Sequence, residues 1–103
     1  MNSGYPDDND IEWLKEELSS LDFHRGAEAI KFLIDSTFYG HADIEGDPMK
    51  LTVTTGGWSG CEEIMDVVFH SLWEMKYWES THRGGKFIFS PLKAYKKGQL
   101  VRV

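Results

Sequence analysis

The residues best suited to chemistry lie in one glycine-rich stretch, residues 54–63, with the sequence TTGGWSGCEE. Such a turn between a strand and a helix can bind phosphate, because free N–H groups and the helix dipole point outward. No lysine followed by serine or threonine comes after these glycines, and Glu62 and Glu63 would compete with a bound anion. The stretch therefore predicts a tight turn in which Ser59 is the N-cap of the next helix, rather than a phosphate site.

Trp58 lies between the glycines of this stretch and has two interpretations. Its ring packs on the rest of the domain, or flexible neighbours such as Gly57 hold it outward as an anchor for a partner. Arg83, in the string HRGGK at residues 82–86, is a second candidate anchor. A hairpin turn at this position would leave the guanidinium group free to act outward.

The nucleophilic and metal-binding residue types are too few or wrongly spaced for catalysis. Cys61 is the only cysteine, and although the start of a helix lowers a thiol pKa, the adjacent Glu62 and Glu63 disfavour the thiolate. Ser59 does not match the nucleophile elbow, because Gly60 follows it directly. We therefore predict that the protein is not an enzyme and has no catalytic residue, metal site or cofactor. The four histidines, which lack metal-ligand spacing, are His24, His41, His70 and His82.

Charge is divided unevenly along the chain. Residues 1–47 hold twelve acids and three bases, a net charge of −9, whereas residues 48–103 hold five acids and eight bases, a net charge of +3. This balance disfavours direct nucleic-acid binding, which needs clustered Lys and Arg. Glu12, Glu16 and Glu17 form either an ordinary solvated helix face or an acidic surface that steers a basic partner.

The first half of the chain predicts two helices joined as an antiparallel hairpin. Residues 1–9 read as a disordered leader, without the basic and apolar parts of a signal peptide. Asp10 is the expected N-cap of a helix that runs to Leu21, and a second helix is expected over residues 25–38. Gly40 is suited to the left-handed backbone conformation expected just after that helix. Residues 41–48 are predicted to be a polar connector.

The second half changes to strand-like alternation. Residues 49–54 predict a half-buried strand, and a helix with Ile64, Val67, Val68 and Leu72 on its inner face is expected after Ser59. Residues 75–81 and 86–90 predict a β-hairpin rich in aromatic side chains. Residues 91–103 form a basic tail, with a short edge strand as an option at residues 99–103.

These elements predict a small α+β domain over residues 10–103, in the order α-α-β-α-β-β. Residues 10–40 would be the helical hairpin and residues 49–90 a β-α-β-β unit, with helices covering one face of an antiparallel sheet. We expect Leu51, Val53, Phe87 and Phe89 to be largely buried in it. The sequence does not fix whether the glycine-rich loop and the hairpin turn lie on the same side.

The string at residues 51–63, followed by Trp78 and by HRGGKF at residues 82–87, resembles a group of short proteins encoded by bacteriophages and prophages. Those proteins share a TGGWSG loop and an Arg-Gly-Gly turn, and the resemblance covers residues 49–90. It implies a gene product that acts in the cytoplasm of a bacterial host cell. The group has no established activity to transfer to particular residues.

Three functions of different classes follow from the sequence, and the one ranked last is a small enzyme built around Cys61 and a spatially adjacent histidine. The first is a small accessory protein that binds a host or phage macromolecule, expected to be a protein, for example to inhibit a defence or nucleic-acid enzyme. The alternative is a small-ligand or nucleotide-binding module that uses residues 56–59. A membrane partner is not expected, since no apolar stretch approaches about 18 residues. The predicted binding residues are Trp58, Arg83, Gly57, Ser59, Glu12 and Glu16.

Overall fold

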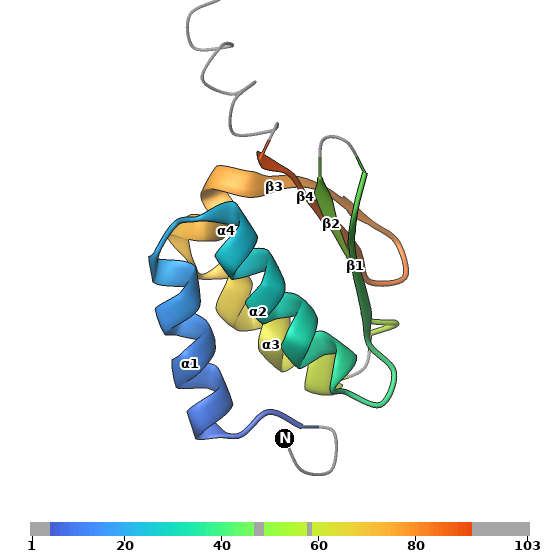
Figure 1. Ribbon diagram of the computed structural model, residues 1–103. Coiled ribbons are helices and arrows are strands. Elements are labelled where there is room, and N and C mark those ends of the chain that lie inside the picture. Colours follow the sequence, from blue (N-terminus) through green and yellow to red (C-terminus); the bar gives the residue numbers. More distant parts are fainter. Residues whose placement is uncertain (1–4, 47–48, 58, 92–103) are drawn as a thin grey trace, which may run out of the picture.

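The computed structural model describes residues 5–46, 49–57 and 59–91. Trp58 and the basic tail from residue 92, with its optional edge strand, lie outside the described residues. Within them, no helix combines the length and the apolar character needed to cross a membrane. The elements in chain order are α1 (Asp8–Ser19), α2 (Phe23–Asp35), β1 (His41–Glu45), β2 (Lys50–Thr54), α3 (Ser59–Phe69), α4 (Leu72–Tyr77), β3 (Trp78–His82) and β4 (Lys86–Phe89) (Figure 1).

The four strands form one antiparallel sheet in the order β1-β2-β4-β3. The α+β class is therefore confirmed, but the predicted order of elements is wrong, because it omitted β1 and α4. Figure 1 shows α2 and α3 on the same side of this sheet. Leu51 pairs with Phe89 and Val53 with Phe87 across β2 and β4. Three of these side chains are buried as predicted, and Phe87 is half-buried.

The first helix begins earlier than predicted. Asp7, not Asp10, is the N-cap: its carboxylate accepts from the Asp10 N–H at 2.8 Å, and the Asp10 carboxylate accepts from the Asp7 N–H at 3.0 Å. This reciprocal capping box satisfies two backbone donors that would otherwise lack partners. Pro6 is buried as well, so residues 6–9 of the predicted disordered leader are part of the fold.

The predicted polar connector after the second helix is wrong, because residues 41–45 form the edge strand β1. It pairs with β2 from His41↔Thr54 to Glu45↔Lys50. Gly40 is not left-handed; it is a site of close packing. A Cβ there would lie 2.4 Å from Thr37 Oγ1 and 2.6 Å from Cys61 Sγ.

The predicted strand over residues 75–81 is wrong in its first part, which belongs to the short helix α4. The Ser71 hydroxyl accepts from the Glu74 N–H at 3.1 Å and caps this helix. Trp73 and Tyr77, four residues apart, then point into the core together. Leu72 was expected to face inward, but it lies at the start of α4 and is 68% exposed.

Trp73 is the centre of an aromatic cluster that joins the helices to the sheet. Its ring stacks on Phe23 at 5.7 Å and contacts Phe89 of β4 at 5.2 Å, both between centroids. The indole N–H donates to the Asp22 carbonyl at 3.1 Å. Gly26 permits this approach, since a Cβ there would lie 2.3 Å from the indole nitrogen.

Tyr77 extends the same cluster to the connection between α1 and α2. Its hydroxyl donates to the carbonyl oxygen of Leu21 at 2.6 Å. Leu21 has a left-handed backbone, with φ of 61°, which is uncommon for a residue other than glycine. The hydrogen bond from Tyr77 helps to hold this strained connection in place.

Candidate functional site

The glycine-rich loop and the hairpin turn, which the sequence left unplaced, lie side by side. The Thr55 N–H donates to the carbonyl oxygen of Gly85 at 2.8 Å. The Thr55 hydroxyl donates to the same oxygen at 3.2 Å. The two most distinctive strings of the sequence therefore form one surface, called here the loop–turn surface (residues 54–57 and 82–86).

Gly85 lies close against the loop. A Cβ on Gly85 would lie 2.3 Å from Thr55 Oγ1 and 3.1 Å from the amide nitrogens of both Gly56 and Gly57. All three glycines have positive φ. This packing fills the space between loop and turn, so a ligand would bind to the outer side of the loop rather than between the two segments. The small-ligand alternative stays a prediction.

The predicted binding residues of this region have different environments. Gly57 is exposed, and Arg83 is exposed at the tip of the hairpin. Ser59 is the first residue of α3 rather than a residue preceding it, and its hydroxyl is hydrogen-bonded to that of Tyr5 at 3.2 Å. The predicted N-cap role of Ser59 is therefore not reproduced. Trp58 lies outside the described residues, and its role as an anchor stays a prediction.

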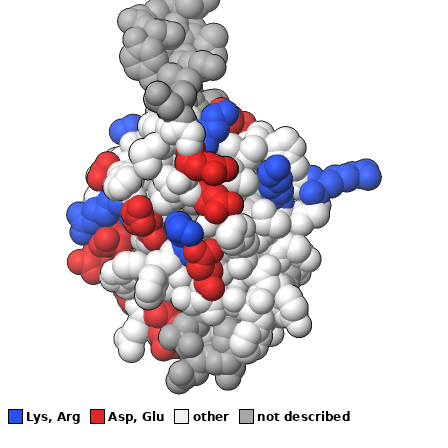
Figure 2. All heavy atoms as spheres, turned by 45° about the vertical axis from the view of Figure 1, so that its right-hand side comes forward, with Lys and Arg blue, Asp and Glu red and all other residues white. Residues whose placement is uncertain are grey.

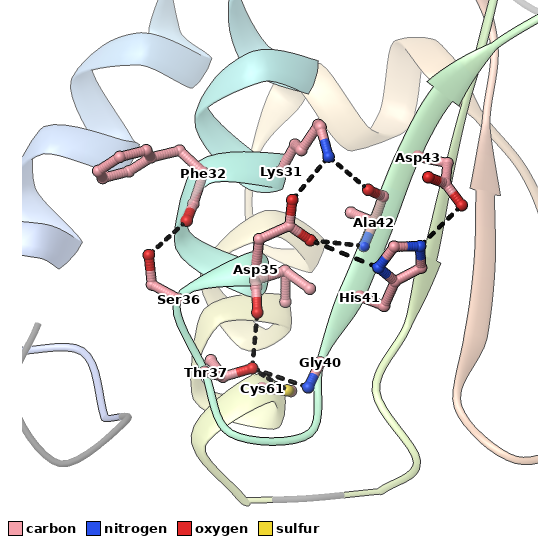
Figure 3. A network of polar contacts seen from close by, with 11 residues as sticks. Lys31, Phe32, Asp35, Ser36, Thr37, Gly40, His41, Ala42, Asp43 and Cys61 are labelled. Atoms are coloured by element: carbon pink, nitrogen blue, oxygen red, sulfur yellow. Dashed lines mark hydrogen bonds and ion pairs between the residues drawn. The ribbon is translucent and has the colours of Figure 1, made fainter.

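Cys61 is buried at the contact between α3 and the end of α2 (Figure 3). Its sulfur lies 3.2 Å from the Thr37 hydroxyl, which itself donates to the Ile34 carbonyl at 2.6 Å. Burial raises the pKa of the Cys61 thiol, and the charge of Glu62 acts in the same direction. A buried, protonated thiol bound to threonine is a packing group and not a nucleophile.

The polar network in Figure 3 joins α2 to β1. The Asp35 carboxylate accepts from Lys31 Nζ at 2.6 Å and from the Ala42 N–H at 2.9 Å. His41 Nε2 and Asp43 Oδ2 lie 2.9 Å apart on the strand. The hydrogen bonds that Lys31 and Asp35 make with Ala42 hold β1 against α2. Among the residues with described positions, no group of three or more His, Cys, Asp or Glu is placed to hold a metal ion.

A groove with exposed aromatic side chains lies along α1 and α2. We call it the acidic groove, and its volume is about 530 Å³. Trp13 and Phe32 meet edge to face there, with ring centroids 5.6 Å apart. They remain 38% and 63% exposed. The groove is lined by Trp13, Glu17, Asp22, His24, Arg25, Glu28, Ala29 and Phe32.

The helices expose these two rings because other positions form the core. Leu14 and Leu18 are the buried side chains of α1, which leaves Trp13 beside the buried stripe. In α2 the buried side chains include Ile30 and Leu33, so Phe32 points away from the core. The sequence analysis missed this pair. The available signal was that both aromatic residues fall off the apolar stripes.

Charged groups surround the aromatic pair. Arg25 donates to both carboxylate oxygens of Glu17, at 3.1 and 2.9 Å, and this contact lowers the pKa of Glu17. His24 Nε2 lies 3.6 Å from Glu28. Asp22 adds a further carboxylate to the lining of the groove. The predicted steering residues Glu12 and Glu16 are exposed on α1.

The sheet side of the molecule has a mixed charge distribution (Figure 2). Figure 2 brings forward the side that lies to the right in Figure 1, which carries the sheet. Acidic and basic groups are interspersed over one part of it, and an uncharged area lies beside them. The residues coloured in this view form no continuous basic surface of the kind that phosphate backbones require.

A second groove of about 510 Å³ separates α1 from α3 and α4. Fewer charged residues line it than line the acidic groove, and the largely exposed Leu72 is one of its lining residues. The charged residues along this groove do not favour a particular kind of ligand. Its lining residues are Lys15, Leu18, Ser19, Leu21, Asp66, Val67, His70, Ser71 and Leu72.

Comparison with protein families, with curated proteins and with solved structures gives no significant match to this chain.

Proposed function

We propose that this protein acts by binding a basic protein partner in the acidic groove. The observation that carries the proposal is the exposed pair Trp13 and Phe32, which lies among carboxylates. Following the resemblance to phage-encoded proteins, we propose a host or phage macromolecule as the partner. Inhibition of a bacterial enzyme is one form that such binding takes.

The exposure of the two rings supports a binding role over a purely structural one. Phe23, Trp73 and Tyr77 show that the domain buries large aromatic side chains where packing is their role. Exposed apolar surface next to polar groups is typical of interaction sites. Tryptophan is also among the residues that most often dominate binding energy.

The charges add specificity to this contact. Glu28 and Asp22 line the groove, and Glu12 and Glu16 extend the acidic surface along α1. Such charges raise the rate of encounter with a basic partner, and this effect weakens as salt is added. Arg83 at the hairpin turn is a second proposed anchor, which variants test separately.

The experiment compares two double variants of the full chain. Trp13→Ala/Phe32→Ala removes the aromatic pair, and Leu72→Ala/Met75→Ala removes two other exposed apolar side chains as a matched control. Each immobilised protein captures partners from a bacterial lysate at low salt, after a thermal melt has shown that it is folded. We expect a basic protein to be retained by the wild type and the control and to be lost by Trp13→Ala/Phe32→Ala. Equal retention by all three proteins would contradict the proposal.

A further inference from the structure

We infer that residues 92–103 of this chain bind in the acidic groove of the same molecule. This inference rests on the proposed function, because it assigns a second occupant to the same groove. An external basic partner must then displace the chain's own segment. The sequence of the segment is LKAYKKGQLVRV, called here the basic segment.

The chain leaves the sheet close to one end of the groove. The Ser90 N–H donates to the Tyr77 carbonyl at 2.9 Å, which places the end of β4 beside Tyr77. The hydroxyl of that same tyrosine donates to the Leu21 carbonyl at 2.6 Å. Asp22, the next residue, lines the groove. A single tyrosine side chain therefore separates the point of exit from the groove.

The chemistry of the basic segment complements that of the groove. It carries four bases, Lys93, Lys96, Lys97 and Arg102, and no acid. The groove offers the carboxylates of Asp22 and Glu28 and two partly exposed aromatic rings. Lysine and arginine bind both kinds of group, the rings by cation–π contact. The apolar residues of the segment, which include Tyr95 and Leu100, match the exposed aromatic pair.

The segment is also long enough. Twelve extended residues span up to about 40 Å. The lining of the groove on α2 runs from Asp22 to Phe32, and ten helical residues rise about 15 Å. The extended length of the basic segment therefore exceeds the length of the groove along α2.

The consequence is competition within the molecule. A tethered segment acts at an effective concentration of about 1 mM. External basic partners with weak affinity are then excluded, while tight partners displace the segment. The competing segment therefore makes the groove selective for tightly binding partners, although no contact between groove and partner is added.

The first test uses nuclear magnetic resonance of the full chain. The Trp13 indole N–H and the backbone N–H of Ala29 report on the groove. Lys96→Glu/Lys97→Glu reverses two charges of the segment, and Arg83→Glu/Lys86→Glu makes the same change in net charge at the hairpin turn. We expect both signals to shift in the first variant and to stay unchanged in the second.

Salt and dilution complete this test. We expect the wild-type signals to move toward those of Lys96→Glu/Lys97→Glu between about 0.1 M and about 1 M NaCl, as the Debye length falls from about 10 to about 3 Å. Dilution leaves them unchanged, because the contact is intramolecular. Identical signals in the wild type and Lys96→Glu/Lys97→Glu, or signals that depend on protein concentration, would overturn the inference.

The second test uses a synthetic peptide with the sequence of residues 92–103. For a dissociation constant near 0.1 mM and an effective concentration near 1 mM, the wild type binds this peptide about tenfold more weakly than Lys96→Glu/Lys97→Glu does. If the wild type and Lys96→Glu/Lys97→Glu bind the peptide equally, and Trp13→Ala abolishes this binding, the intramolecular contact is overturned and the proposed function is supported. No binding to either protein would also overturn the inference, and the capture experiment then decides the proposed function by itself.

Discussion

Replacing Gly85 by alanine tests the contact between the glycine-rich loop and the hairpin turn. Gly85 has φ of 77°, and its missing Cβ would lie 2.3 Å from Thr55 Oγ1. Gly84 provides the matched control, because its φ is 84° but no atom lies within 4 Å of the corresponding position. Both variants place a side chain on left-handed backbone, and only Gly85→Ala also displaces the loop.

The expected magnitudes follow from these two contributions. Left-handed backbone costs an L-residue about 1–2 kcal/mol, which is the full expected effect of Gly84→Ala. Displacing Thr55 also weakens the two hydrogen bonds that it donates to the Gly85 carbonyl, each with a net contribution of about 1 kcal/mol. We therefore expect Gly85→Ala to lower the free energy of unfolding by about 3–4 kcal/mol.

Urea denaturation followed by circular dichroism measures both variants. A double-mutant cycle with Thr55→Ala adds a second measurement, since removing the hydroxyl relieves the closest clash. In that background, Gly85→Ala should cost less than it does in the wild type. Equal losses for Gly84→Ala and Gly85→Ala, or a cycle without coupling, would refute the packing of the turn on the loop.

Three further predictions concern other contacts. The hydrogen bond from the Asp10 N–H lowers the pKa of Asp7, so its stabilising charge is present at neutral pH and is lost as the pH falls through that lowered pKa. Asp7→Ala should therefore lower the melting temperature at pH 7 with a difference that shrinks in acid, and a pH-independent difference would contradict this. Because burial raises the pKa of Cys61, a thiol reagent should label it in urea and leave the folded protein unlabelled, as mass spectrometry would show. Tyr77→Phe removes the hydrogen bond to the Leu21 carbonyl and should cost about 1 kcal/mol in urea denaturation; a stability equal to that of the wild type would contradict this.

The sequence predicted those elements whose apolar pattern is strong. Leu51 and Val53 alternate with polar residues, and β2 occupies the expected place. The strand β1 has the same alternation but was missed because Ala42, Asp43 and Glu45 are residue types that are depleted in strands, whereas β2 is rich in Thr and Val. An edge strand with one polar face has no strong signal of its own, and pairing with β2 decides its structure.

Residues 75–77 show how tertiary contacts decide between helix and strand. Aromatic residues favour strands, so Tyr77 and Trp78 predicted one together. The helical spacing of Trp73 and Tyr77, with Ser71 as the cap, places both rings in one cluster. In a strand, Trp73 and Tyr77 would also lie on one face of the sheet. The ring of Trp73 would then lack the stacking on Phe23 that the helix provides.

The candidate site was predictable only in part. The strings around Gly57 and Arg83 were identified, but their contact depends on the register between β2 and β4, which pairs Thr54 with Lys86. Residues so distant in sequence give no local signal of proximity. By contrast, Trp13 and Phe32 could have been found, because both fall outside the apolar stripes of their helices.

The acidic groove and the loop–turn surface share no residue, so variants can distinguish them as binding sites. Trp13→Ala/Phe32→Ala changes the groove and leaves the contact between Thr55 and Gly85 intact. Arg83→Ala removes an exposed side chain at the turn and leaves the groove intact. Loss of partner binding in the first variant alone assigns the site to α1 and α2. Loss in Arg83→Ala alone assigns it to the turn, and the aromatic pair then has no part in recognition.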